Sequence, residues 1–179
     1  MIILKVISGK YKGKKIEGFN IEGTRPTMDR VKESMFASIQ NKIKDSIVLD
    51  LFAGSGQLGI EALSNGAKYV YFFDKSDICI NVIKNNLKSI NDTNNIVMKM
   101  DYKKSLQYLK NQVKFDIIIL DPPYNDFLIN DALDSIYNYD LLNEDGIIVC
   151  EYENELINTK FEIYKQKRYG KKYVTIYKK

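Results

Sequence analysis

The stretch "SIVLDLFAGSGQLGIEALSNG", residues 46–66, decides the fold class of this chain. A short apolar run, typical of a buried strand, leads into a glycine-rich loop that opens a helical pattern. Gly66 follows the last periodic residue, where glycine ends many helices. Gly54, Gly56 and Gly59 have the spacing G-x-G-x-x-G, which lets a ligand approach the backbone at a helix start. The spacing indicates a nucleotide-binding unit, although a tight turn without a ligand produces the same pattern.

Outward from this unit, short apolar runs alternate with helical patterns. Strands are expected within 46–52, 67–74, 95–101, 115–120 and 146–152, and helices within 56–66, 76–90, 103–111 and 128–142. Strands rich in isoleucine and valine that alternate with helices indicate a parallel sheet covered on both faces. Right-handed crossovers then produce a doubly wound, Rossmann-like α/β fold. In the second helix, the residues at helical spacing that are expected to face the core are Ile78, Val82, Ile83 and Leu87.

The N-terminal part carries a different pattern. Residues 2–19 predict a small β-hairpin arm whose turn lies in the stretch rich in glycine and lysine. Residues 27–43 predict a helix with Thr27 as its N-cap. One face of this helix is expected in the core and consists of Val31, Met35, Ile39 and Ile43.

The C-terminal segment, residues 160–179, predicts two strands around Gly170 that complete a mostly parallel sheet of seven strands. We therefore expect a single domain over residues 1–179. Within it, residues 1–23 form the basic N-terminal hairpin arm and residues 24–179 the Rossmann-like core.

The composition excludes several kinds of site. The 179 residues contain no histidine, which removes a Ser-His-Asp triad and histidine-ligated metals, and we expect no metal site. Cys79 and Cys150 stand far apart without a ligand-like spacing, so both are expected to be buried thiols of a cytoplasmic protein. No apolar run is long enough to span a membrane, and the N-terminal apolar run is too short for a signal peptide.

Charge is distributed unevenly along the chain. The net charge is +4 overall, but it is +4 over residues 1–33, about −7 over the middle and +7 over residues 160–179. Tyrosines are interleaved with the basic residues at both ends. Because cations neutralise phosphates and aromatic rings stack on bases, this pattern favours a nucleic-acid partner over an ordinary solvated surface.

Aspartates stand at the ends of three successive predicted strands: Asp50, Asp74 and Asp101. A carboxylate at Asp50 would repel a pyrophosphate but suits an ammonium group. Asp74 is placed to accept from a ribose diol, and Asp101 from an adenine amine. Each aspartate alone is also compatible with a turn former or a helix cap. The ligand that fits all three is S-adenosylmethionine, whereas an NAD-dependent dehydrogenase is disfavoured by Asp50, the short chain and the missing histidine.

A fourth aspartate, Asp121, follows the predicted strand of 115–120 and opens the motif "DPPY" with Pro122, Pro123 and Tyr124. A pair of prolines makes a stiff, extended exit from a strand. Taken alone, the motif is equally compatible with a simple strand terminator.

With these motifs the chain resembles the class I S-adenosylmethionine-dependent methyltransferases. The stretches that carry the resemblance are "DLFAGSG" at 50–56, Asp74, Asp101 and "DPPY" at 121–124. DPPY-type motifs after the fourth strand are similar to those of enzymes that methylate exocyclic amino nitrogens.

A closer resemblance concerns the arm and the first helix. "SGKYKGKKI" at 8–16 and "TRPTMDRVKESMF" at 24–36 are similar to segments of the bacterial 16S ribosomal RNA guanine-N2 methyltransferases of the RsmD type. The resemblance covers nearly the whole chain, including a "RYG" segment near the C-terminus. Two departures are Gln57, where a small residue is common, and Asp74, where glutamate is frequent.

The resemblance implies methyl transfer to the exocyclic amine of a flipped-out guanine. Asp121 and the carbonyl of Pro122, stiffened by Pro123, would accept hydrogen bonds from the amine, and Tyr124 would stack on the base. The residues expected to bind the cofactor are Asp50, Phe52, Gly54, Gly56, Asp74, Lys75, Asp101 and Tyr102.

The resemblance also implies contacts with small-subunit ribosomal RNA, free or within a partly assembled ribosomal particle. The residues expected to make them are Lys10, Lys12, Lys14, Arg25, Thr27, Arg30, Arg168 and Tyr169. Any single lysine is also compatible with an ordinary solvated charge. We expect a monomer without a membrane partner. Two alternatives stay open: an adenine-N6 methyltransferase, because DPPY serves both amines, and a non-catalytic RNA-binding protein with this fold.

Overall fold

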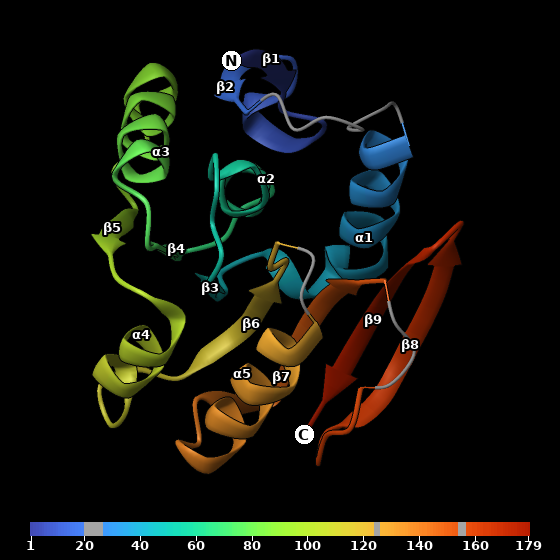
Figure 1. Cartoon of the computed structure of the whole chain (residues 1–179). Coiled ribbons are helices and arrows are strands. Elements are labelled where there is room, and N and C mark those ends of the chain that lie inside the picture. The colour runs from blue at the N-terminus through green and yellow to red at the C-terminus, as the bar shows by residue number, and fades with distance from the viewer. Residues whose placement is uncertain (20–26, 124–125, 154–156) are drawn as a thin grey trace.

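The computed structural model of the chain describes residues 1–19, 27–123, 126–153 and 157–179. Its centre is a seven-stranded sheet with the strand order β5-β4-β3-β6-β7-β9-β8 (Figure 1). The strands are β3 (Ile47–Asp50), β4 (Tyr69–Asp74), β5 (Asn95–Lys99), β6 (Phe115–Leu120), β7 (Leu142–Tyr152), β8 (Glu162–Tyr169) and β9 (Lys172–Lys178). β3 to β7 are parallel, and β9 pairs antiparallel with both β7 and β8. The expected α/β fold with a mostly parallel sheet of seven strands is confirmed.

Helices cover both faces of the sheet, as Figure 1 shows. One face carries α1 (Thr27–Ile43), α2 (Gln57–Ser64) and α3 (Asp77–Ile90), and the other carries α4 (Tyr102–Leu109) and α5 (Asp126–Asn138). Val48 and Ile117 belong to the first core, whereas their neighbours Leu49 and Ile118 belong to the second. Successive strand residues thus bury opposite faces, which explains the continuously apolar runs. No helix in the described part of the chain is long and apolar enough to cross a membrane.

The faces of the helices follow the expected spacing with two corrections. All four expected core residues of α1 are buried, and the helix begins at Thr27 itself, which was predicted to precede it as the N-cap. In α3, three of the four expected core residues are buried, but Ile78 is 68% exposed and Ile80 is buried instead. Two helical residues are separated by roughly 200° around the axis when they stand two apart, so Ile78 and Ile80 point to different sides.

The N-terminal arm is the expected hairpin, with β1 (Ile2–Lys5) antiparallel to β2 (Lys15–Gly18) and a 3-10 turn, η1 (Gly9–Tyr11), between them. This turn docks on α2. The carboxylate of Glu61, 2% exposed, accepts from the backbone N–H groups of Ile7 and Ser8 at 2.9 and 2.7 Å. Gly9 lies so close that a Cβ there would come within 2.0 Å of the Ser64 carbonyl oxygen. The turn of the arm is therefore packed against the core.

Both cysteines carry free thiols. Cys150 in β7 is fully buried, and burial raises the pKa of its thiol. Cys79, in the first turn of α3 beside the exposed Ile78, is only partly buried, so the expectation of a core residue is wrong here. Desolvation still raises the pKa of the Cys79 thiol.

Candidate active site

Three of the predicted aspartates lie where the central strands end. β3 lies between β4 and β6, and all three strands are parallel, so their carboxyl ends share one edge of the sheet. Asp50 and Asp74 are the last residues of β3 and β4, and Asp121 directly follows β6. The strand order reverses at β3, and doubly wound sheets bind their ligands at this position.

Backbone N–H groups hold two of these carboxylates. Asp50, 1% exposed, accepts from Gly59 at 2.9 Å, and Asp74 accepts from Gly54 and Ser76, both at 2.9 Å. Gly54 has a φ of 54°, and a Cβ built on it meets no described atom within 4 Å. The backbone of the loop therefore borders open space, and the left-handed conformation at Gly54 favours glycine.

The other two glycines of the motif shape the start of α2. Gly56 is the N-cap of α2 and has a φ of 78°. A Cβ on Gly59 would come within 2.2 Å of the Phe72 ring in β4. Gly59 therefore permits close packing of the helix on the sheet, one of the functions of glycine in such loops.

Burial weakens the ionisation of Asp50. Loss of solvent, together with the neighbouring carboxylates of Asp121 and Asp74, raises the pKa of its carboxyl to about 7, although the hydrogen bond from the Gly59 N–H and the ammonium group of Lys32 oppose the rise. No three acidic or cysteine side chains in the described part of the chain form a group that could hold a metal ion. The cluster is therefore suited to bind positive charge and hydrogen-bond donors.

Asp121 has charged neighbours that were not predicted from the sequence. Desolvation and the carboxylate of Glu151 together raise the pKa of its carboxyl to about 7, and the ammonium groups of Lys172 and Lys32 oppose the rise. Glu151, buried near the end of β7, forms a salt bridge with Lys172 in β9. The signal for Glu151 was available, because it follows the apolar run of residues 147–150 within β7, much as Asp50 follows the apolar residues of β3.

A buried lysine from α1 also reaches this edge. Lys32 is 7% exposed, and its ammonium group donates to the side-chain oxygen of Gln57, the first residue of α2. Arg30, one of the two residues of α1 predicted to contact RNA, is exposed. Lys32 thus belongs to the carboxylate cluster, although the pattern of α1 did not distinguish it from the basic residues of a solvated face.

The other residues predicted to bind the cofactor follow the ends of β3, β4 and β5, and Asp101, the residue predicted to contact adenine, lies just beyond β5. Asp101 caps α4, because its carboxylate accepts from two backbone N–H groups in the first turn of that helix. The rings of Phe52 and Tyr102 lie 5.5 Å apart, and the Tyr102 hydroxyl donates to Asp131 at 2.7 Å. Lys75 is exposed. Asp101 therefore caps a helix, which was one of the two alternatives left open by the sequence. One of its carboxylate oxygens already accepts hydrogen bonds within the chain.

Of the "DPPY" motif, the structure describes the first three residues. Asp121 is partly buried, Pro122 is buried and Pro123 is exposed. Tyr124 lies outside the described residues, and so do Arg25 and the side chain of Thr27. The three described residues leave β6 at the edge where Asp50 lies.

Comparison with known proteins decides the family. A family model described as "Conserved hypothetical protein 95" matches residues 4–178. "Ribosomal RNA small subunit methyltransferase D" of Haemophilus influenzae is 37% identical over 155 residues, which are 85% of this chain and 80% of that protein. The chain belongs to the RsmD-type methyltransferase family.

Two further similarities cover almost the whole length of the chain. A protein of Bacillus subtilis named as an rRNA methyltransferase, YlbH, is 40% identical over 182 residues, covering 98% of this chain and 99% of that one. The solved structure of the methyltransferase yhhF from Escherichia coli superposes with a TM-score of 0.87 at 27% identity, covering 98% of this chain and 97% of that chain. S-adenosylmethionine is the cofactor of this fold class, and the carboxylates beside the open loop fit its ammonium and ribose groups.

Within this RsmD-type fold, the lysines of the arm are not equivalent. Lys10 forms a 3.2 Å salt bridge with the buried carboxylate of Asp92, which also accepts from the Tyr11 hydroxyl at 2.7 Å. Lys12 and Lys14 are exposed. Lys10 therefore helps to dock the arm, and Lys12 and Lys14 offer their charges to solvent.

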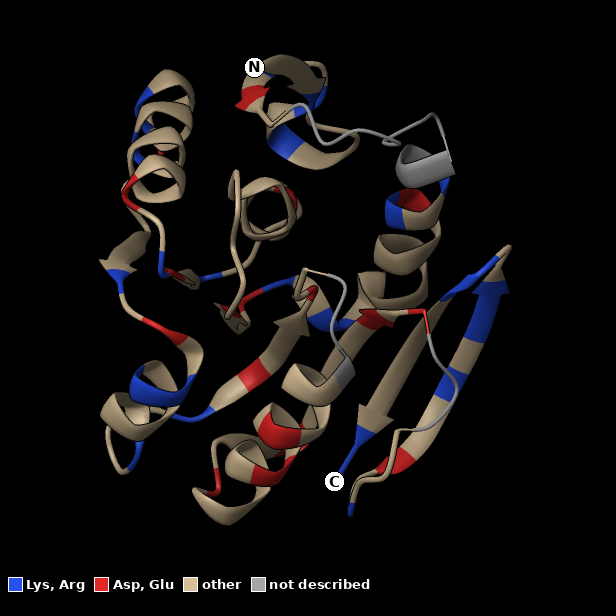
Figure 2. Ribbon diagram, in the orientation of Figure 1, with Lys and Arg blue, Asp and Glu red and all other residues tan. Residues whose placement is uncertain are grey.

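The predicted contacts at the other end lie on the β8–β9 hairpin. Figure 2 shows basic residues along β8. Arg168 donates to the Gly170 carbonyl at 2.9 Å and stacks over the Tyr173 ring at 5.3 Å. The Tyr169 hydroxyl contacts the Ser34 hydroxyl of α1. Arg168 thus makes contacts within the hairpin, and Tyr169 joins the hairpin to α1.

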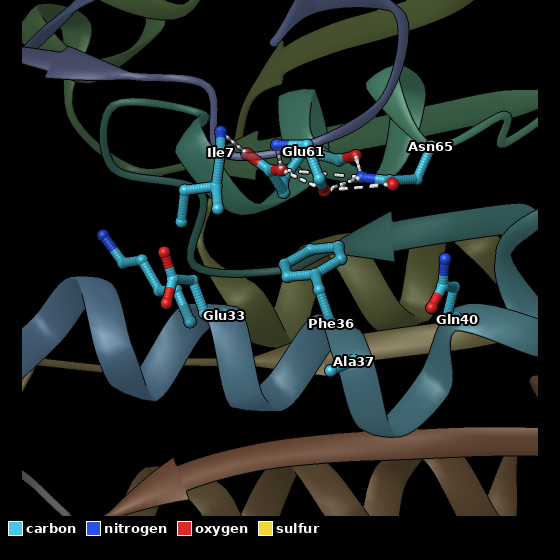
Figure 3. Close-up of a pocket in the computed structure, with 9 residues that line it drawn as sticks. Ile7, Glu33, Phe36, Ala37, Gln40, Glu61 and Asn65 are labelled. Atoms are coloured by element: carbon cyan, nitrogen blue, oxygen red, sulfur yellow. Dashed lines mark hydrogen bonds between the residues drawn. The ribbon is translucent and has the colours of Figure 1, made fainter. Parts of the chain in front are cut away.

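A groove of about 210 Å³ lies between the arm, α1 and α2. Figure 3 shows Ile7, Glu61 and Asn65 on one side and Glu33, Phe36 and Gln40 of α1 on the other. Lys32 lines this groove and also acts electrostatically on Asp50 and Asp121. The groove is therefore connected to the carboxylate cluster through one side chain.

Proposed function

We propose that this chain transfers a methyl group from S-adenosylmethionine to the exocyclic N2 amine of a guanine in small-subunit ribosomal RNA. The observation that carries the proposal is the position of Asp121 and the two prolines at the edge where Asp50 and Asp74 border the open glycine loop. The name of the Haemophilus influenzae relative supports the small-subunit substrate. The similarity of the arm and α1 to RsmD-type segments supports guanine over adenine.

The bound cofactor supplies a methyl group that its sulfonium already activates, so the protein needs no covalent nucleophile. A guanine amine is a poor nucleophile because its lone pair is delocalised into the ring. The protein must therefore hold both N–H groups on acceptors, so that the nitrogen pyramidalises toward the methyl group. In this proposal Asp121 supplies a carboxylate oxygen and Pro122 its carbonyl oxygen, which Pro123 keeps in place.

Asp121 acts chiefly as an orienting acceptor, and the surplus proton leaves late, to solvent. Its raised pKa is compatible with this role because about half of the population is ionised near pH 7. Tyr124, which lies outside the described residues, is assigned by the family resemblance to stacking on the flipped base.

RNA is held mainly through its phosphates in this proposal. Lys12 and Lys14 of the arm and Arg30 of α1 are exposed and free to approach a backbone phosphate. Arg25, outside the described residues, belongs to the same group by resemblance. We further propose a cytoplasmic monomer that acts on free RNA or on a partly assembled particle.

The proposal is tested by transfer of labelled methyl from S-adenosylmethionine to small-subunit RNA that lacks the modification, free and in partly assembled particles. The labelled nucleoside is then identified. N2-methylguanosine at one site supports the proposal and shows which form of the RNA is the substrate. If N6-methyladenosine is found instead, the fold and the proposed acceptor mechanism still hold, but guanine is excluded as the substrate base. Absence of transfer to both substrates, with intact cofactor binding, would favour a non-catalytic RNA-binding protein.

A further inference from the structure

Gln57 is buried at the start of α2, and only one of the two polar atoms of its side-chain amide has a hydrogen-bond partner among the described residues. Its side chain is 5% exposed, and its oxygen accepts from Lys32. The amide nitrogen finds no hydrogen-bond acceptor among the described residues. A buried donor without a partner is costly, so such a group in a native structure indicates a missing ligand, water or ion.

The surroundings of this amide favour an anion. Gln57 directly follows Gly56, the N-cap of α2, where backbone N–H groups and the helix dipole give a positive potential. The ammonium group of Lys32, 7% exposed, contacts the same side chain. A buried amide donor, a buried cation and a helix N-terminus thus converge on one point.

The size and place of the anion follow from the burial. Both side chains are almost completely shielded from solvent, which suits a small carboxylate better than a phosphate of a polynucleotide. The point adjoins Asp50, because Lys32 acts on the pKa of the Asp50 carboxyl and Asp50 accepts from Gly59 in the same helix. A ligand with an ammonium group for Asp50 and a carboxylate beside it is an α-amino acid.

We propose that the Gln57 amide and the Lys32 ammonium bind the carboxylate of the methionine part of S-adenosylmethionine. This inference rests on the proposed placement of the cofactor beside Asp50. Lys32 and Gln57 are thus binding residues contributed by two different helices. The glutamine, which departs from the small residue common in the family, supplies a donor that a small residue lacks.

The test compares two ligands on two variants by calorimetry: S-adenosylmethionine and its decarboxylated analogue, which keeps the ammonium, sulfonium and adenosine groups. Gln57→Leu removes the amide at nearly constant volume, and Gln57→Glu retains the acceptor for Lys32 but replaces the donor. Wild-type protein should bind the full cofactor more tightly than the analogue by roughly tenfold or more, since hydrogen bonds to charged groups are strong. Because Lys32 remains in both variants, both should reduce this discrimination severalfold while the affinity for the analogue changes little.

The matched control is Gln40→Leu on α1, an exposed glutamine that lines the groove two turns beyond Lys32. It should leave both affinities unchanged. Equal losses for both ligands in the Gln57 variants would show a purely structural role and overturn the inference. If the Gln57 variants still distinguish the full cofactor from its decarboxylated analogue but bind RNA more weakly, the inference is overturned, and the site would bind an RNA phosphate instead. Failure of the wild-type protein to bind either ligand would instead reject the proposed cofactor site itself.

Discussion

Asp121 combines a raised pKa with a role that requires its ionised form. The acid predominates below about pH 7 and the carboxylate above it, and only the carboxylate accepts with both oxygens. Methyl transfer should therefore increase with pH, by up to about tenfold per unit below the pKa. Single-turnover rates at saturating cofactor between about pH 6 and pH 8 measure this. A flat profile would contradict an acceptor role for the carboxylate.

The control for that profile is Asp121→Asn, whose amide oxygen accepts a hydrogen bond but does not titrate. This variant should be slower than the wild-type protein and almost independent of pH over the same range. A persistent rise would assign the titration to another group, and Asp50 is a candidate because its carboxyl also has a pKa of about 7.

Removal of the Asp121 side chain tests the same residue at one pH. Asp121→Ala should lower the transfer rate by about 10²–10³, the usual effect of removing one group that stabilises a transition state. Cofactor affinity should stay nearly intact. Asp134→Ala, an exposed aspartate of α5, is the matched control and should be fully active. Normal turnover in the Asp121 variant would refute its place in the site.

At the scale of elements, the carboxylate of Glu61 is the acceptor for two backbone N–H groups where the arm docks on α2. Glu61→Ala leaves the backbone N–H groups of Ile7 and Ser8 without an acceptor, so stability in urea should decrease by about 1–3 kcal/mol. Amide hydrogens in the arm should exchange faster, whereas cofactor affinity should change little. Glu144→Ala, a mostly exposed carboxylate paired with Lys179, should change stability by less than about 0.5 kcal/mol.

Hydrogen exchange also separates two explanations for that variant. Faster exchange confined to the arm shows that Glu61 acts as a clamp between two elements. Faster exchange throughout α2 and the sheet would mean that Glu61 stabilises the whole core, and the docking interpretation would then be wrong.

Most elements were predictable because their signals are local. The apolar run of β6 coincides with the predicted strand, and the periodicity of α1 identifies its buried face. Ile78 was misplaced because helical spacing gives a relative angle between residues but not the absolute direction of the core. Asp101 was predicted to end a strand, but β5 ends two residues earlier, at Lys99, and Asp101 is the N-cap of α4.

The charged neighbours of the carboxylate cluster were not predictable in the same way. Lys32 meets Gln57 across 25 residues of sequence, and Glu151 meets Lys172 through the pairing of β7 with β9. These contacts arise from the packing of distant elements, and no spacing rule encodes them. The aspartates at the strand ends were accessible because parallel strands bring their carboxyl ends to one edge.

At the scale of the whole molecule, positive charge is carried by the arm and by the β8–β9 hairpin. If the arm contacts phosphates, the affinity for RNA should decrease with salt. The slope of log affinity against log salt should become less steep by about 0.7 for each phosphate contact removed on a single strand. The double variant Lys12→Ala with Lys14→Ala should therefore reduce the magnitude of the slope by about 1.4. Filter binding at several salt concentrations measures the slope.

The matched control replaces Lys110 and Lys114, two exposed lysines in the loop that leads into the amino end of β6, opposite the carboxylate edge. This pair should leave the slope unchanged. An equal effect of both pairs would show that RNA responds to net charge alone, and the arm would then have no special part in binding.

The low reactivity of the two native thiols, one buried and one partly buried, makes the protein suitable for mapping its contacts by site-directed cross-linking. Thiolates are the reactive form of cysteine, and the raised pKa of both native thiols keeps them protonated at neutral pH. A cysteine introduced at the exposed Lys12 or Lys171 would therefore be alkylated first, without removal of Cys79 or Cys150. A photoactivatable group attached at each position in turn would mark the nucleotides that lie against the arm and against the hairpin.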